Sequence, residues 1–187
     1  MAKPPFAPET GYWFLARDPV DRFVSAYRWR RYVFTTGRLN GPDGSLNERN
    51  SAERDYLGRH PSVDELALSI PGSGCVPLGP LDQRGPFLIG HVERGFAWHY
   101  DDLLDRIDPS QVLGVIALES IDDDCEAVFG FRPTLRENAS YPHEGGELSA
   151  DGRAILAALL AGEYATLRRL AGIAAAGGAH VPASLTA

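Results

Sequence analysis

The chain has 187 residues, of which 44% are hydrophobic and 23% charged, and it carries a formal net charge of −7. These proportions are typical of a globular protein with one domain. No apolar run reaches the ~20 residues of a membrane-spanning helix, and the first ten residues lack the apolar stretch of a signal peptide. The composition therefore predicts a cytoplasmic protein without a membrane span.

The charge is unevenly distributed along the chain. Residues 1–60 hold ten Lys and Arg against seven Asp and Glu, whereas the remainder is strongly acidic. A short basic segment in an acidic protein favours a local anionic ligand over nucleic acid, which requires a broad basic face. The alternative is that the surface charge is unevenly distributed without any functional consequence. Cys75 and Cys125 have no metal-ligand spacing and are expected to be free thiols, so no metal is predicted.

The first predicted element is a buried strand over 12–16, a short aromatic and aliphatic run. A helix over 19–34 follows, because Asp18 can cap free N–H groups and Pro19 suits the first helical turn. The product is a strand, a tight turn and a helix, which is the unit from which parallel α/β sheets are built.

The later elements follow from caps, breakers and periodicity. Ser62 and Glu65 form a capping-box pattern, and Ser149 is placed to cap a last amphipathic helix. The remaining expectations are a polar surface excursion over 36–59, a short helix from 62 to 69, a long loop over 71–86, a helix over 91–107, a central strand over 112–118, a short helix over 125–129 and a frayed tail over 173–187. The fold class predicted is a single α/β domain over 1–187, with a three-layer parallel sheet flanked by helices.

The segment RDPVDRFVSAY, residues 17–27, carries the chemistry. Arg17 ends a strand one residue before a helix N-terminus, so a planar fork of donors and unpaired backbone N–H groups converge on one point. Arg22 and Ser25 lie three residues apart and share one face of that helix. Together they predict an anion site. The alternative is that Arg17 pairs with a carboxylate and Ser25 is a surface hydroxyl.

This segment resembles the 3′-phosphate-binding motif of sulfotransferases that use 3′-phosphoadenosine 5′-phosphosulfate (PAPS). The resemblance extends over about 12–172, through residues 99–104, 112–120, 129–131 and 136–140. It implies the P-loop sulfotransferase-like fold, PAPS as co-substrate, and transfer of sulfate to a hydroxyl-bearing acceptor such as a carbohydrate, lipid or small molecule. It also implies that Arg17 and Ser25 bind the 3′-phosphate, with Arg22 beside them.

One part of the family pattern is missing. The family holds the 5′ end of PAPS with a lysine-bearing loop after its first strand, and only sixteen residues precede Arg17. The sole lysine is Lys3, which is followed by two prolines, and the glycines of 71–74 have no lysine among them. We therefore expect the fold to lack its first strand–loop–helix. The chain is then a truncated or inactive sulfotransferase, or a non-catalytic nucleotide-binding or interaction module.

Two further expectations concern catalysis and assembly. The family's base precedes the 3′-phosphate motif, so the catalytic candidates here are His91 and His99, with Glu93 between them. Three adjacent carboxylates, residues 122–124, predict a solvated turn or helix start rather than a metal site. A sheet without its first strand exposes an edge or an apolar face, which predicts self-association.

Overall fold

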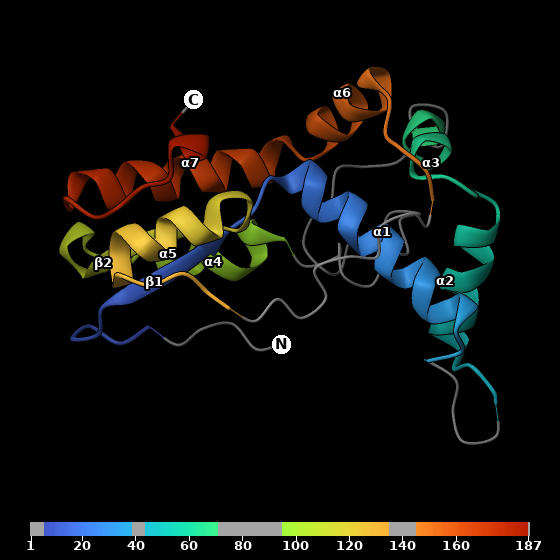
Figure 1. Cartoon of the computed structure of the whole chain (residues 1–187), viewed down its shortest axis with the longest axis horizontal. Helices are drawn as coiled ribbons and strands as arrows, with labels where there is room; N and C mark the ends of the chain where they lie inside the picture. The colour runs from blue at the N-terminus through green and yellow to red at the C-terminus, as the bar shows by residue number, and fades with distance from the viewer. Residues whose placement is uncertain (1–5, 39–43, 71–94, 135–144, 187) are drawn as a thin grey trace. The chain divides into compact units, whose positions relative to one another are not determined.

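The computed structural model describes residues 6–38, 44–70, 95–134 and 145–186 (Figure 1). The chain divides into two compact units. The first contains residues 1–18, 94–137 and 161–187, and the second contains residues 19–93 and 138–160. The chain passes between the units after residues 18, 93, 137 and 160, and the first passage divides the predicted strand–turn–helix between them. The expected single domain stays a prediction.

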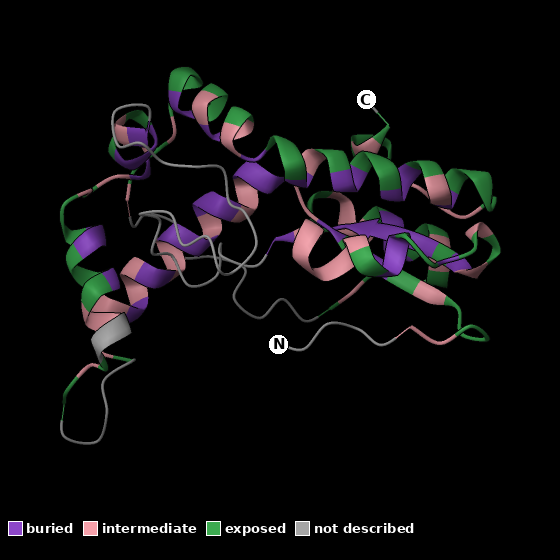
Figure 2. Ribbon diagram, turned by 180° about the vertical axis from the view of Figure 1, so that it is seen from behind, coloured by how far each residue is buried: buried purple, intermediate pink, exposed green. Residues whose placement is uncertain are grey.

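The first unit contains a small parallel sheet. Strand β1 (Tyr12–Ala16) pairs with β2 (Val112–Ala117), and Ala16 lies opposite Ala117 at the carboxyl ends of the two strands. Both strands lie where the sequence predicts them. β2 is buried at five of its six residues, as expected for a central strand, and Figure 2 shows most of it as buried. In the described ranges the sheet has these two strands, so the protein is mixed α/β but mostly helical.

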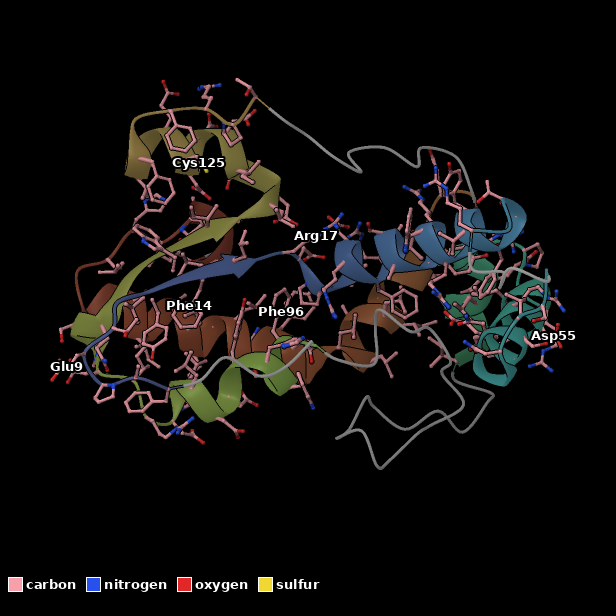
Figure 3. All side chains as sticks on the ribbon, turned by 90° about the horizontal axis from the view of Figure 1, so that it is seen from below. Glu9, Phe14, Arg17, Asp55, Phe96 and Cys125 are labelled. Carbon is pink, nitrogen blue, oxygen red and sulfur yellow. The ribbon has the colours of Figure 1, made fainter. Side chains whose placement is uncertain are left out.

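Helices lie on both sides of this sheet. α4 (Phe96–Leu104) and α7 (Ala161–Ala176) pack together on one side, and α5 (Ile121–Phe129), which carries Cys125, lies on the other (Figure 3). The core between the strands, α4 and α7 is a set of apolar side chains that are at most 8% exposed: Phe14, Ala16, Leu103, Leu104, Ile107, Val112, Val115, Leu167, Leu170 and Ala174.

A side chain of α7 caps the N-terminus of α4. Residue Gly95 precedes α4 and supplies no side chain, and the buried Glu163 carboxylate accepts the hydrogen bond from the Phe96 backbone N–H instead. A Cβ at Gly95 would collide with the Glu163 carboxylate. A carboxylate at a helix N-terminus also interacts favourably with the helix dipole.

Gly95→Ala is therefore expected to lower the free energy of unfolding by about 1–3 kcal/mol, because the new methyl group displaces the capping carboxylate. The matched variant Gly172→Ala is expected to raise it by about 0.5–1 kcal/mol, since Gly172 lies inside α7 with open space around its Cα. Urea denaturation measures both changes. Equal effects of the two substitutions would contradict the proposed capping.

The sheet exposes apolar side chains. Trp13 and Leu15 lie two residues apart on β1 and share one face of the sheet, and Leu113 lies on β2; all three are 43–53% exposed. The Trp13 ring contacts the Phe129 ring of α5 in a tilted arrangement, with 4.9 Å between the centroids, and Phe129 is itself 43% exposed. These side chains are the physical basis for the self-association expected from the sequence.

Self-association stays a prediction, and sedimentation velocity over a concentration series tests it. We expect the weight-average sedimentation coefficient to rise with concentration. Trp13→Ser should reduce the rise, because it removes the largest exposed side chain of that face. A monomer at every concentration would contradict the prediction.

The end of the chain is ordered, so the prediction of a frayed tail is wrong. α7 continues to Ala176, Gly178 takes the left-handed conformation (φ 72°) that ends it, and residues 183–185 form a 3₁₀ turn. His180 pairs in parallel with Gly114, and its carbonyl accepts the hydrogen bond from the Val115 N–H. The segment therefore pairs with the second edge of β2 at one position.

The second unit is made of four helices. They are α1 (Pro19–Thr35), α2 (Glu48–Gly58), α3 (Val63–Ser69) and α6 (Ala150–Leu159). α1 contacts the other three, and Asp64 at the start of α3 accepts hydrogen bonds from the backbone and hydroxyl of Ser149, the N-cap of α6. The predicted capping box of Ser62 and Glu65 is present.

Two predictions for this unit are wrong. The polar segment 36–59 contains α2, which Asn47 caps and which buries Glu53, Tyr56 and Leu57. The last helix is two helices, because the chain leaves helical geometry at Leu160 (ψ 16°) between α6 and α7. In the described ranges, no helix is long and apolar enough to cross a bilayer.

Candidate functional site

The carboxyl end of the two-stranded sheet brings together Arg17 and Glu119. Both residues follow the paired residues Ala16 and Ala117, because parallel strands end at the same edge. Arg17 Nε lies 3.9 Å from Glu119 Oε1, and each side chain is 33% exposed. This separation exceeds hydrogen-bond length. Within the described part of the chain, the Arg17 guanidinium has this ion pair and no hydrogen-bond acceptor.

The turn after β1 completes this cluster. The Asp18 backbone N–H donates to Glu119 Oε1 at 2.9 Å, and the Asp18 carboxylate accepts a hydrogen bond of 2.8 Å from the Tyr164 hydroxyl. We call Arg17, Asp18, Glu119 and Tyr164 the strand-end cluster. The alternative in which Arg17 pairs with a carboxylate is borne out, since Arg17 and Glu119 form an ion pair, although not a hydrogen bond.

Arg22 and Ser25 lie on α1, in the second unit, and both are half-buried. The Ser25 hydroxyl makes no hydrogen bond within the described ranges, whereas the neighbouring Arg30 and Arg31 of the same helix are engaged by Glu53 and by the carbonyl of Leu57. Among the residues that the structure describes, the Ser25 hydroxyl therefore has no acceptor. Because Arg17 belongs to the first unit, a joint site of Arg17 and Ser25 stays a prediction.

The catalytic candidates from the sequence are only partly described. His91 and Glu93 lie outside the described residues. His99 lies on α4, where its ring stacks edge-on against Trp98 at 4.6 Å. His99 belongs to the first unit, and its role as a base stays a prediction.

A second polar cluster was not predicted. Asp124 is 5% exposed, and its Oδ2 accepts hydrogen bonds of 2.9 Å from the Ala117 N–H and the Ser120 hydroxyl. Its Oδ1 lies 3.0 Å from His180 Nε2. The three carboxylates lie in the first turn of α5, as the expected helix start, but Asp124 is buried there whereas Asp123 is 77% exposed. The cluster ties the last segment of the chain to the end of β2.

Sequence reasoning could not identify these partners. Glu119 is 101 residues from Asp18, and His180 is 56 residues from Asp124. The one local signal is that Glu119 follows a strand predicted to be central, where parallel strands end at a common edge. Among the described residues, no three His, Cys, Asp or Glu side chains are arranged to hold a metal ion.

The strand-end cluster can therefore offer an anion the Arg17 guanidinium and the Asp18 backbone N–H, in competition with the Glu119 carboxylate. Comparison of the chain with protein-family models, with curated proteins and with solved structures gives no match.

Proposed function

We propose that this chain is a sulfotransferase-type protein that binds the 3′-phosphate of PAPS, or of its product 3′-phosphoadenosine 5′-phosphate, through Arg17 and Ser25. The observation that carries the proposal is that the guanidinium of Arg17 and the hydroxyl of Ser25 have no hydrogen-bond acceptor within the described residues. Both stand at the positions that the resemblance of RDPVDRFVSAY assigns to the phosphate. A phosphate would supply those acceptors.

The secondary structure around the motif supports the same proposal. β1 ends at Ala16 and α1 begins at Pro19, so Arg17 lies in a strand-to-helix turn of two residues. Charge-assisted contacts to phosphate contribute about 1.5–3 kcal/mol each, which corresponds to roughly 10- to 100-fold in affinity. The proposal includes the three-layer, P-loop sulfotransferase-like fold. It also includes a cytoplasmic location.

The reaction proposed is transfer of the sulfuryl group to a hydroxyl of a carbohydrate, lipid or small molecule. The acceptor oxygen forms a bond to sulfur, the bond between sulfur and the bridging oxygen breaks, 3′-phosphoadenosine 5′-phosphate leaves, and a base takes the hydroxyl proton. His91 and His99 are the candidate bases of this chain. Positioning and charge stabilisation would supply most of the catalysis, as in phosphoryl transfer.

A second candidate is a nucleotide-binding or interaction module without transferase activity. Such a module binds the nucleotide through the same Arg17 and Ser25.

Arg17→Ala is expected to weaken binding of 3′-phosphoadenosine 5′-phosphate by about 10- to 100-fold, and Ser25→Ala is expected to weaken it less. Isothermal titration calorimetry measures both. The matched control is Arg169→Ala, which makes the same charge change at an exposed arginine paired with Asp105.

An assay of sulfate transfer from radiolabelled PAPS to a panel of sugars, sterols and phenols distinguishes the two candidate functions. Sulfate transfer by the wild type supports the enzyme, and binding that depends on Arg17 without transfer supports the module. No binding by the wild type, or equal binding by Arg17→Ala, would overturn both.

A further inference from the structure

Glu119 already places an anionic oxygen at the donors that the proposed 3′-phosphate would use. Its Oε1 accepts the hydrogen bond from the Asp18 N–H at 2.9 Å and lies 3.9 Å from Arg17 Nε. It is the one carboxylate within 4 Å of the Arg17 guanidinium in the described part of the chain. The other nearby carboxylate, that of Asp18, is engaged by the Tyr164 hydroxyl.

The position of Glu119 is fixed by the fold. It lies in the 3₁₀ turn over Leu118–Ser120, two residues after Ala117, whose strand partner Ala16 directly precedes Arg17. The register of the parallel strands thus brings the two side chains to the same edge. The pair is only one-third exposed, so solvent screens it incompletely.

We propose that Glu119 is an internal competitor for the phosphate site, and that a nucleotide 3′-phosphate binds by displacing its carboxylate from the Asp18 N–H and from the neighbourhood of Arg17. This inference rests on the function proposed above. A phosphate within hydrogen-bond distance of Arg17 would lie within a few ångströms of the Glu119 carboxylate, and like charges at that distance repel strongly at a partly buried site. Glu119 therefore sets how tightly the site holds a phosphate.

The substitution Glu119→Gln tests this inference. The amide keeps an oxygen that can accept from the Asp18 N–H, so the turn retains its hydrogen bond, while the competing charge is removed. The matched control is Glu9→Gln, which makes the same charge change in the same unit; Glu9 precedes β1, whereas Arg17 follows it (Figure 3).

Calorimetry compares 3′-phosphoadenosine 5′-phosphate with adenosine 5′-monophosphate, which lacks the 3′-phosphate. We expect Glu119→Gln to bind the first ligand about tenfold more tightly than wild type, with no gain for the second ligand and none in Glu9→Gln. An unchanged or weaker affinity in Glu119→Gln, or an equal gain for both ligands, would overturn the inference while leaving the proposed function intact. Absence of binding by both wild type and Glu119→Gln would overturn the two together.

A second measurement uses the wild-type chain and is independent of how the variant folds. The ¹⁵N–¹H resonance of Asp18 reports the acceptor of its backbone N–H. Titration with 3′-phosphoadenosine 5′-phosphate should move this resonance with the same saturation curve as binding, because the carboxylate acceptor is replaced. A resonance that stays in place at saturation would contradict displacement.

Discussion

Replacement of Glu53 by alanine is expected to lower the free energy of unfolding by about 3–5 kcal/mol. Glu53 is 1% exposed on α2, and both of its carboxylate oxygens accept hydrogen bonds from the Arg30 guanidinium of α1, itself 8% exposed. Removal of the carboxylate leaves a buried, uncompensated charge on Arg30. Asn50 Oδ1, which also accepts from Arg30, cannot neutralise that charge. Chemical denaturation monitored by circular dichroism measures the loss.

The control for this prediction lies on the same helix. Asp55, which is labelled in Figure 3, is 68% exposed and pairs with Arg54 at 3.5 Å. Asp55→Ala is therefore expected to change stability by less than about 1 kcal/mol. The double variant Arg30→Met with Glu53→Met should recover most of the stability, since a buried ion pair can be replaced by packed apolar side chains. A loss in Glu53→Ala no larger than that in Asp55→Ala would show that the pair does not hold α1 to α2.

Asp124→Ala is expected to cost about 2–4 kcal/mol, because three donors lose their acceptor at a buried position. These donors are the Ala117 N–H, the Ser120 hydroxyl and the His180 ring. The loss should also release the end of the chain from β2. Hydrogen exchange of the Val115 N–H, which donates to the His180 carbonyl, should therefore accelerate more than exchange elsewhere in β2.

Asp123→Ala is the matched control for Asp124, since it removes an exposed carboxylate one residue earlier in the first turn of α5. It is expected to change stability by less than about 1 kcal/mol and to leave Val115 exchange unchanged. Slow exchange at Val115 in Asp124→Ala would contradict the account of this cluster.

The part of the fold predicted best from the sequence is the part with strong local signals. β1 is predicted by the apolar run of residues 12–16, and the beginning of α1 by the pair Asp18–Pro19. α3 is predicted by the capping box of Ser62 and Glu65. These signals depend on residues at most four positions apart.

The elements that were missed depend on tertiary contacts. α2 has no apolar stripe, and its inner face is stabilised by the ion pair of Glu53 with Arg30, which no periodicity indicates. The chain end is held by pairing of His180 with β2 rather than by its own composition. The helix breaks at Leu160, where the chain leaves the second unit for the first. The helical spacing of apolar residues continues across this position, so the sequence predicts a single helix.

In the candidate site, too, the residues with local sequence signals could be predicted and those placed by tertiary contacts could not. Arg17, Arg22 and Ser25 could be selected from one local segment, because the chemistry of a strand-to-helix turn is local. Glu119 and Tyr164 could not, since strand register and the docking of α7 bring them to Asp18 from more than a hundred residues away.

The central claim is that Arg17 and Ser25 bind one nucleotide phosphate. A crystal structure of the full chain with 3′-phosphoadenosine 5′-phosphate tests it most directly. We expect the 3′-phosphate oxygens within about 3 Å of the Arg17 guanidinium and the Ser25 hydroxyl. A nucleotide bound elsewhere, with the Arg17 guanidinium still beside the Glu119 carboxylate, would contradict the claim.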